Sequence, residues 1–102
     1  MQLDILQRIL IFSVLPKEGN LLTMKTLRSL KEKVGFSEED LDKYNIRLEG
    51  TNYKWDASKD IPVEFDITEG EVKLIKTGLK ELDTQGKLME QHLSLCELFN
   101  VE

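Results

Sequence analysis

The apolar residues of this chain change their spacing twice, from helical to alternating near residue 45 and back to helical near residue 68. Residues 3–34 repeat at helical intervals, whereas residues 46–67 alternate apolar with polar, as half-buried strands do. A block of strands between two blocks of helices predicts an α+β fold. The predicted order is three N-terminal helices, a three-stranded antiparallel hairpin and sheet, and two C-terminal helices.

Helix-breaking and capping residues set limits for the first two helices. Pro16 disfavours helical geometry at the residue before it, so the first helix should end near Leu15. This helix is apolar nearly all round, which is typical of a central helix. The second helix should be capped by Thr23 and stopped by Gly35.

The alternating block predicts a hairpin with its turn at residues 49–52, followed by a third strand. Tyr53 and Trp55 share one face of the second strand. They form either a stacking platform for a partner or part of the core, and we favour the core. The apolar strand positions are Ile46 and Leu48, then Tyr53 and Trp55, then Val63, Phe65 and Ile67.

The C-terminal block begins with a capping box formed by Thr68 and Glu71. Gly70 and Gly78 each weaken the helix that follows by roughly 1 kcal/mol relative to alanine, so tertiary packing has to support it. Gly86 closes this helix, and a last helix carries apolar residues at Met89, Leu93, Cys96 and Phe99.

The composition fits one small globular domain over residues 1–102, with 40% hydrophobic and 32% charged residues. The single cysteine excludes an internal disulfide and favours a reducing compartment. The most apolar stretch, residues 9–15, is far shorter than the roughly 20 residues that span a membrane. We therefore expect a cytoplasmic protein with no membrane partner.

The net charge of −5 is unevenly distributed, with +3 on residues 1–36 and −8 on residues 37–102. Three helices followed by a hairpin is the order found in winged-helix domains, where the third helix reads the major groove of DNA. Here Ser37 and Asp40 form a capping box that predicts this helix over about 38–44. Because it carries the carboxylates Glu38, Glu39, Asp40 and Asp42, we expect it to repel phosphates.

The second helix carries the one local basic surface, formed by Lys25, Arg28 and Lys31 at three-residue spacing. It indicates either a phosphate-bearing or acidic partner, or an ordinary solvated helix face paired with the acidic half of the chain. We favour the solvated face because surface charge alone rarely signifies binding.

Metal, cofactor and catalytic sites are not expected. His92 and Cys96 are four residues apart on one helix, but there is no other cysteine or histidine to complete a zinc site. The acidic residues 38–42 lack the glycine and the bidentate acid of a calcium loop. Since no phosphate-binding glycine loop or activated nucleophile is present, we predict that the protein is not an enzyme.

Four segments, in this order and spacing, resemble small uncharacterised proteins of bacteriophages and prophages. They are Leu15-Pro16-Lys17-Glu18-Gly19, Leu27-Arg28 through Gly35-Phe36-Ser37-Glu38-Glu39, Trp55-Asp56, and Gln91-His92-Leu93-Ser94-Leu95. The resemblance carries no catalytic signature. It implies a small accessory or regulatory protein made in the cytoplasm of a bacterial host.

Three hypotheses follow. The first is a non-enzymatic protein-binding module, such as a phage-encoded accessory protein or an inhibitor of a host complex, whose acidic part suits a basic partner surface. The second is a winged-helix-like protein that binds nucleic acid through its second helix and hairpin. The third is a structural, homo-oligomeric phage component, a homodimer for example, that uses an exposed part of the first helix.

Overall fold

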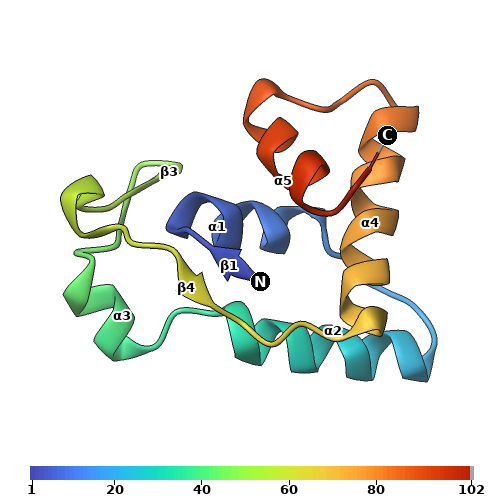
Figure 1. The fold of residues 1–102 in the computed structure, drawn as a ribbon, viewed down its shortest axis with the longest axis horizontal. Helices are drawn as coiled ribbons and strands as arrows, with labels where there is room; N and C mark the ends of the chain where they lie inside the picture. The colour runs from blue at the N-terminus through green and yellow to red at the C-terminus, as the bar shows by residue number, and fades with distance from the viewer. Residues whose placement is uncertain (102) are drawn as a thin grey trace.

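The computed structural model describes residues 1–101 and has an α+β fold in which helices dominate (Figure 1). Helix α1 lies at the centre, with α2 below it, α4 along one side and α5 above. A hairpin and α3 lie at the opposite end from α4. The elements are β1 (Gln2–Leu3), α1 (Ile5–Val14), α2 (Leu21–Val34), α3 (Glu38–Lys43), β2 (Arg47–Glu49), β3 (Asn52–Lys54), β4 (Val63–Glu64), α4 (Glu69–Thr84) and α5 (Leu93–Leu98).

The strands do not form the predicted three-stranded sheet. Within residues 1–101 they form two separate antiparallel pairs, β2 with β3 and β4 with β1. Leu3 pairs with Val63, and the Phe65 amide donates a hydrogen bond to the Met1 carbonyl at 2.8 Å. The prediction failed because β1 has only two residues, too few to show a period, and Leu3 fits the helical pattern of α1. The chain thus has the predicted succession of three helices, three strands and two helices with β1 added before the first helix, and the winged-helix-like arrangement is not confirmed.

Most helix limits agree with their capping signals. Helix α1 ends at Val14, with Leu15 as its C-cap, and α2 ends at Gly35, as predicted. The start of α2 was predicted wrongly, because Asn20 rather than Thr23 is its N-cap and accepts the Thr23 amide at 2.8 Å. Leu21 and Leu22, which follow the cap, are exposed and lie outside the buried face made by Leu27, Leu30 and Val34, which had indicated the helix.

Both predicted capping boxes are confirmed. The Ser37 hydroxyl accepts the Asp40 amide, and the Asp40 carboxylate accepts the Ser37 amide, each at 3.2 Å. Thr68 and Glu71 make the equivalent pair at the start of α4. These two boxes fix where the chain enters α3 and α4.

The main core lies between α1, α2, α4 and α5, and α4 packs closely against α1 at Gly78. A Cβ atom at Gly78 would lie 2.1 Å from the carbonyl oxygen of Val14, so only glycine fits at this crossing. Helix α4 was expected to need tertiary support, and the close contact of Gly78 with the backbone of Val14 provides it. The fully buried side chains of this core include Leu3, Ile11, Leu30, Val34, Ile75, Leu79 and Leu95.

A buried ion pair joins α2 to the start of α4. Lys33 Nζ donates to Glu71 Oε1 at 2.6 Å and to the Asp66 carbonyl at 2.9 Å. Burial raises the pKa of Glu71, but the hydrogen bonds and the charge of Lys33, with the hydrogen bonds at Thr68, outweigh it and lower the pKa overall. Glu71 is therefore charged in the folded protein.

We expect Glu71→Gln to lower the free energy of unfolding at neutral pH by about 1.5 kcal/mol, since it removes a charge-assisted hydrogen bond. A carboxyl whose pKa is lowered on folding adds stability above its unfolded pKa of about 4.3 and loses it as the pH falls through the folded pKa. The wild-type protein should therefore lose stability below about pH 4.3 more steeply than the variant. Urea unfolding at several pH values measures this, and equal pH dependence would contradict it.

Candidate protein-binding surface

A second, smaller core packs α3 and the hairpin against α1. Its buried members are Ile5 of α1 with Tyr44 and Ile46, which lie just before the hairpin. Ile9, Phe36 and Trp55 pack against it and are partly buried. This cluster covers only the base of the hairpin, so the rest of the hairpin extends beyond the helices.

An open apolar groove of about 550 Å³ lies next to this cluster. Leu41 of α3 and Tyr53 of the hairpin stand on its sides with 39% and 51% of their surfaces exposed. Apolar side chains left this exposed around a concave surface are typical of binding sites. The groove is lined by Ile9, Phe12, Ser13, Phe36, Leu41, Ile46 and Tyr53.

The hairpin register brings its apolar residues to one face. Leu48 lies directly opposite Tyr53, and Gly50 makes the turn with a positive φ of 63°. The predicted hairpin is thus confirmed. Our assignment of Tyr53 to the core was wrong. Trp55 at the base of the hairpin packs against the second core, whereas Tyr53 and Leu48 do not, and Leu48 is 61% exposed.

Helix α3 places one residue, Leu41, in the groove and carries several carboxylates on its exposed side chains. Glu38, Glu39 and Asp42 are exposed and make no ion pair within the part of the chain that the structure describes. Leu41 lies among them in the sequence and lines the groove. The three carboxylates are therefore unpaired on the same short helix as Leu41, although none of them lines the groove itself.

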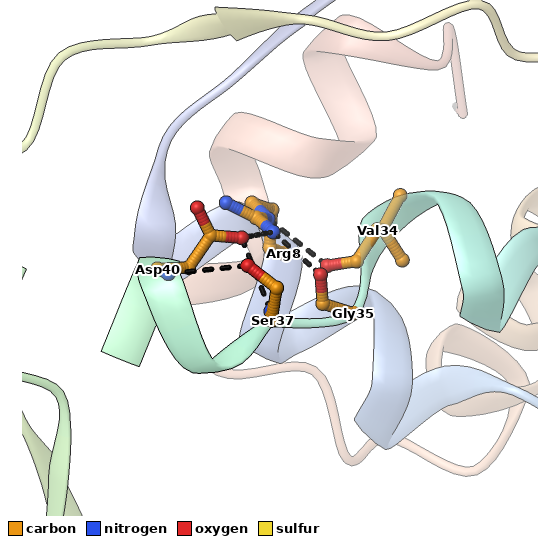
Figure 2. A network of polar contacts seen from close by, with 5 residues as sticks. All are labelled: Arg8, Val34, Gly35, Ser37 and Asp40. Atoms are coloured by element: carbon orange, nitrogen blue, oxygen red, sulfur yellow. Dashed lines mark hydrogen bonds and ion pairs between the residues drawn. The ribbon is translucent and has the colours of Figure 1, made fainter. Parts of the chain in front are cut away.

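Asp40 has a different role from the other three acids, because it faces inward to Arg8 of α1 (Figure 2). Arg8 is 4% exposed, and its guanidinium donates to the Val34 carbonyl at 2.9 Å, the Gly35 carbonyl at 2.7 Å and Asp40 Oδ2 at 3.3 Å. It also lies 4.2 Å from the centre of the Phe36 ring. Arg8 thus holds the end of α2 and the start of α3 in place, which positions the groove.

The sequence contained one signal for Arg8 that we did not use. It is the single charged residue of a largely apolar helix. A buried arginine in such a helix needs several hydrogen-bond acceptors. Its acceptors include two backbone carbonyls distant in sequence. The pattern alone did not indicate which groups they would be.

The basic residues of α2 lie apart from the groove. Lys25, Arg28 and Lys31 are exposed, and a shallow depression beside Arg28 and Lys31 shares no lining residue with the apolar groove. Lys33 of the same helix is paired with Glu71. Lys25, Arg28 and Lys31 make no ion pair within residues 1–101. The structure therefore does not bring the predicted basic and acidic candidates into one site.

His92 and Cys96 are both buried. His92 Nδ1 accepts the Met89 amide at 2.9 Å, which draws the ring inward. Burial, followed by the nearby charge of Asp83, raises the pKa of the Cys96 thiol, so it is held in its unreactive protonated form. Across residues 1–101, no three His, Cys, Asp or Glu side chains gather as metal ligands would.

Comparisons with known proteins gave no match to a protein-family model, to a curated protein or to a solved structure. The resemblance to phage proteins remains a prediction. None of the helices in residues 1–101 is long and apolar enough to span a membrane.

Proposed function

We propose that the protein is a non-enzymatic protein-binding module and that the apolar groove is its binding site. The observation that carries the proposal is the groove itself, with exposed Leu41 and Tyr53 on its sides. The same helix as Leu41 carries Glu38, Glu39 and Asp42, which make no ion pair within residues 1–101. Its occupant is a segment of a partner protein with apolar side chains flanked by lysine or arginine.

Apolar burial and charge have separate roles in this binding. Covering Tyr53, Leu41 and Leu48 removes exposed apolar surface from water, and aromatic residues of this kind often dominate binding energies. The acids of α3 attract a basic segment and exclude acidic ones, which improves specificity and the rate of association. A phage-encoded inhibitor or accessory protein would use such a surface against a host complex.

Short random peptides displayed with free C-termini test the proposal directly. Selection on the immobilised protein should enrich peptides that combine two or more apolar residues with adjacent basic residues. Tyr53→Ala should weaken the binding of a selected peptide about thirtyfold, which is typical for loss of an aromatic anchor. Ile61→Ala is the matched control, because Ile61 is equally apolar, exposed and outside the groove, and it should leave affinity unchanged.

Charge variants separate this proposal from nucleic-acid binding. Neutralising Glu38, Glu39 and Asp42 together should weaken peptide binding about tenfold and reduce its salt dependence. Neutralising the α2 residues Lys25, Arg28 and Lys31 should have no effect on it. If the protein instead bound duplex DNA with an affinity that fell steeply with salt, and the α2 variant abolished that binding, the nucleic-acid alternative would replace the proposal.

A homo-oligomer is the third outcome of the same experiments. If no peptide were enriched and light scattering gave a stable dimer that Tyr53→Ala dissociated, the groove would be a contact between copies of this chain. The proposed partner would then be wrong.

A further inference from the structure

A second groove of about 550 Å³ lies on the other side of Tyr53, between the hairpin and the segment that leads into α5. It shares Ile9, Ser13 and Tyr53 with the first groove, so the two grooves are contiguous. Its walls include Leu6, Leu10, Trp55, Leu82 and Met89.

The polar residues of the second groove differ in charge from those beside the first. Lys87, Gln91 and His92 line it, together with Thr51 and Asn52 of the hairpin turn, and no aspartate or glutamate does. Lys87 is exposed and makes no ion pair within residues 1–101. The helix that carries Leu41 of the first groove is thus acidic, and the continuation of that groove carries a cation and hydrogen-bond donors.

His92 supplies a donor whose position is fixed. Only 6% of its surface is exposed, and because its Nδ1 accepts the Met89 amide, the proton of the neutral ring lies on Nε2. This N–H has no acceptor among residues 1–101. Glu71 Oε2 is the one fully enclosed side-chain polar atom without a partner in that part of the chain, so Nε2 of His92 is in contact with solvent.

We infer that the partner segment continues past Tyr53 into the second groove and presents a carboxylate to His92 Nε2 and Lys87. The inference rests on the proposed function and extends it by giving the segment a direction, with its basic residues at α3 and its carboxylate at His92. The carboxylate is the C-terminus of the segment or an acidic side chain.

The chemistry of the site favours a carboxylate over a neutral acceptor. A carboxylate accepts from the imidazole N–H through a charge-assisted hydrogen bond and gains attraction to Lys87. The apolar walls make the pair stronger than it would be in open water. Loss of either donor should therefore be measurable as a loss of peptide affinity.

The test uses the selected peptides, each synthesised with a free C-terminus, with a C-terminal amide, and with its acidic side chains replaced by their amides. One of the two amide forms should bind at least about tenfold more weakly than the unmodified peptide, as expected for loss of a charge-assisted hydrogen bond. Whichever amide form binds more weakly identifies the source of the carboxylate. His92→Asn should weaken the free-acid peptide by a similar factor while leaving the amide form unaffected. The Asn side chain keeps an acceptor near the Nδ1 position for the Met89 amide but removes the Nε2 donor.

Lys87→Gln provides a second variant that does not touch the interior, and Lys80→Gln on α4 is the matched control outside both grooves. Lys87→Gln should reduce the preference for the carboxylate, and Lys80→Gln should not. Equal affinity of the wild-type protein for the acid and both amide forms would overturn the inference while leaving the proposed function intact. Failure to enrich any peptide would instead remove the proposed function.

Discussion

Replacing Gly78 with alanine is expected to lower the free energy of unfolding by at least about 3 kcal/mol, a large fraction of the total stability of a protein of this size. The added Cβ would stand 2.1 Å from the Val14 carbonyl oxygen and 3.2 Å from the Val14 Cβ. Because the close neighbour is backbone, the only relief is for α1 and α4 to move apart, which loosens the main core. Thermal unfolding should show a fall in Tm of roughly 15 °C.

Gly70→Ala is the matched control on the same helix. Its Cβ would meet nothing closer than Thr26 Cγ2 at 4.0 Å, so alanine fits without strain. Since alanine is the better helix former, this variant should gain up to about 1 kcal/mol. If both variants were as stable as the wild-type protein, the close contact between α1 and α4 would be wrong.

Replacing Arg8 with leucine is expected to cost about 3 kcal/mol, because it removes one member of a buried, hydrogen-bonded ion pair and leaves its acceptors unpaired. The Val34 and Gly35 carbonyls at the end of α2 would lose their donor, and Asp40 would lose its cation. Urea unfolding should show a lower midpoint with an unchanged slope. Peptide binding should weaken as well, since α3 carries one side of the groove.

Asp40→Asn is the control for the charge alone. Asp40 is only partly buried, and asparagine keeps an oxygen that can accept from Arg8 and from Ser37. We expect a loss of at most about 1 kcal/mol. A loss as large as that of Arg8→Leu would show that the ion pair, rather than the two carbonyl contacts, holds α3 in place.

Features encoded by neighbouring residues were predicted well from the sequence. The end of α1 before Pro16, the end of α2 at Gly35, the two capping boxes and the turn at Gly50 all depend on contacts within a few positions. Such signals identify the boundaries of elements because they satisfy backbone groups locally. The acidic character of α3 was also predicted correctly from its sequence.

Features that depend on distant residues were missed or misread. The pairing of β1 with β4 joins residues about 60 positions apart and leaves no trace in a two-residue strand. The carbonyls that Arg8 bonds belong to another helix, and the exposure of Tyr53 depends on how far the hairpin extends past α1. Of the predicted site residues, Glu38, Glu39 and Asp42 lie on the helix that contributes Leu41 to the groove, whereas the apolar lining of the groove emerges only from packing.

The small sheet of β1 and β4 has a consequence for the order in which the chain assembles. By pairing Leu3 with Val63 it closes a loop that contains α1, α2, α3 and the hairpin. Closing a long loop costs chain entropy before the contacts between its ends stabilise the chain, whereas helices and hairpins close short loops quickly. We therefore expect this two-residue pairing to form late in folding and to open early, although it connects the two ends of the region that lines the first groove.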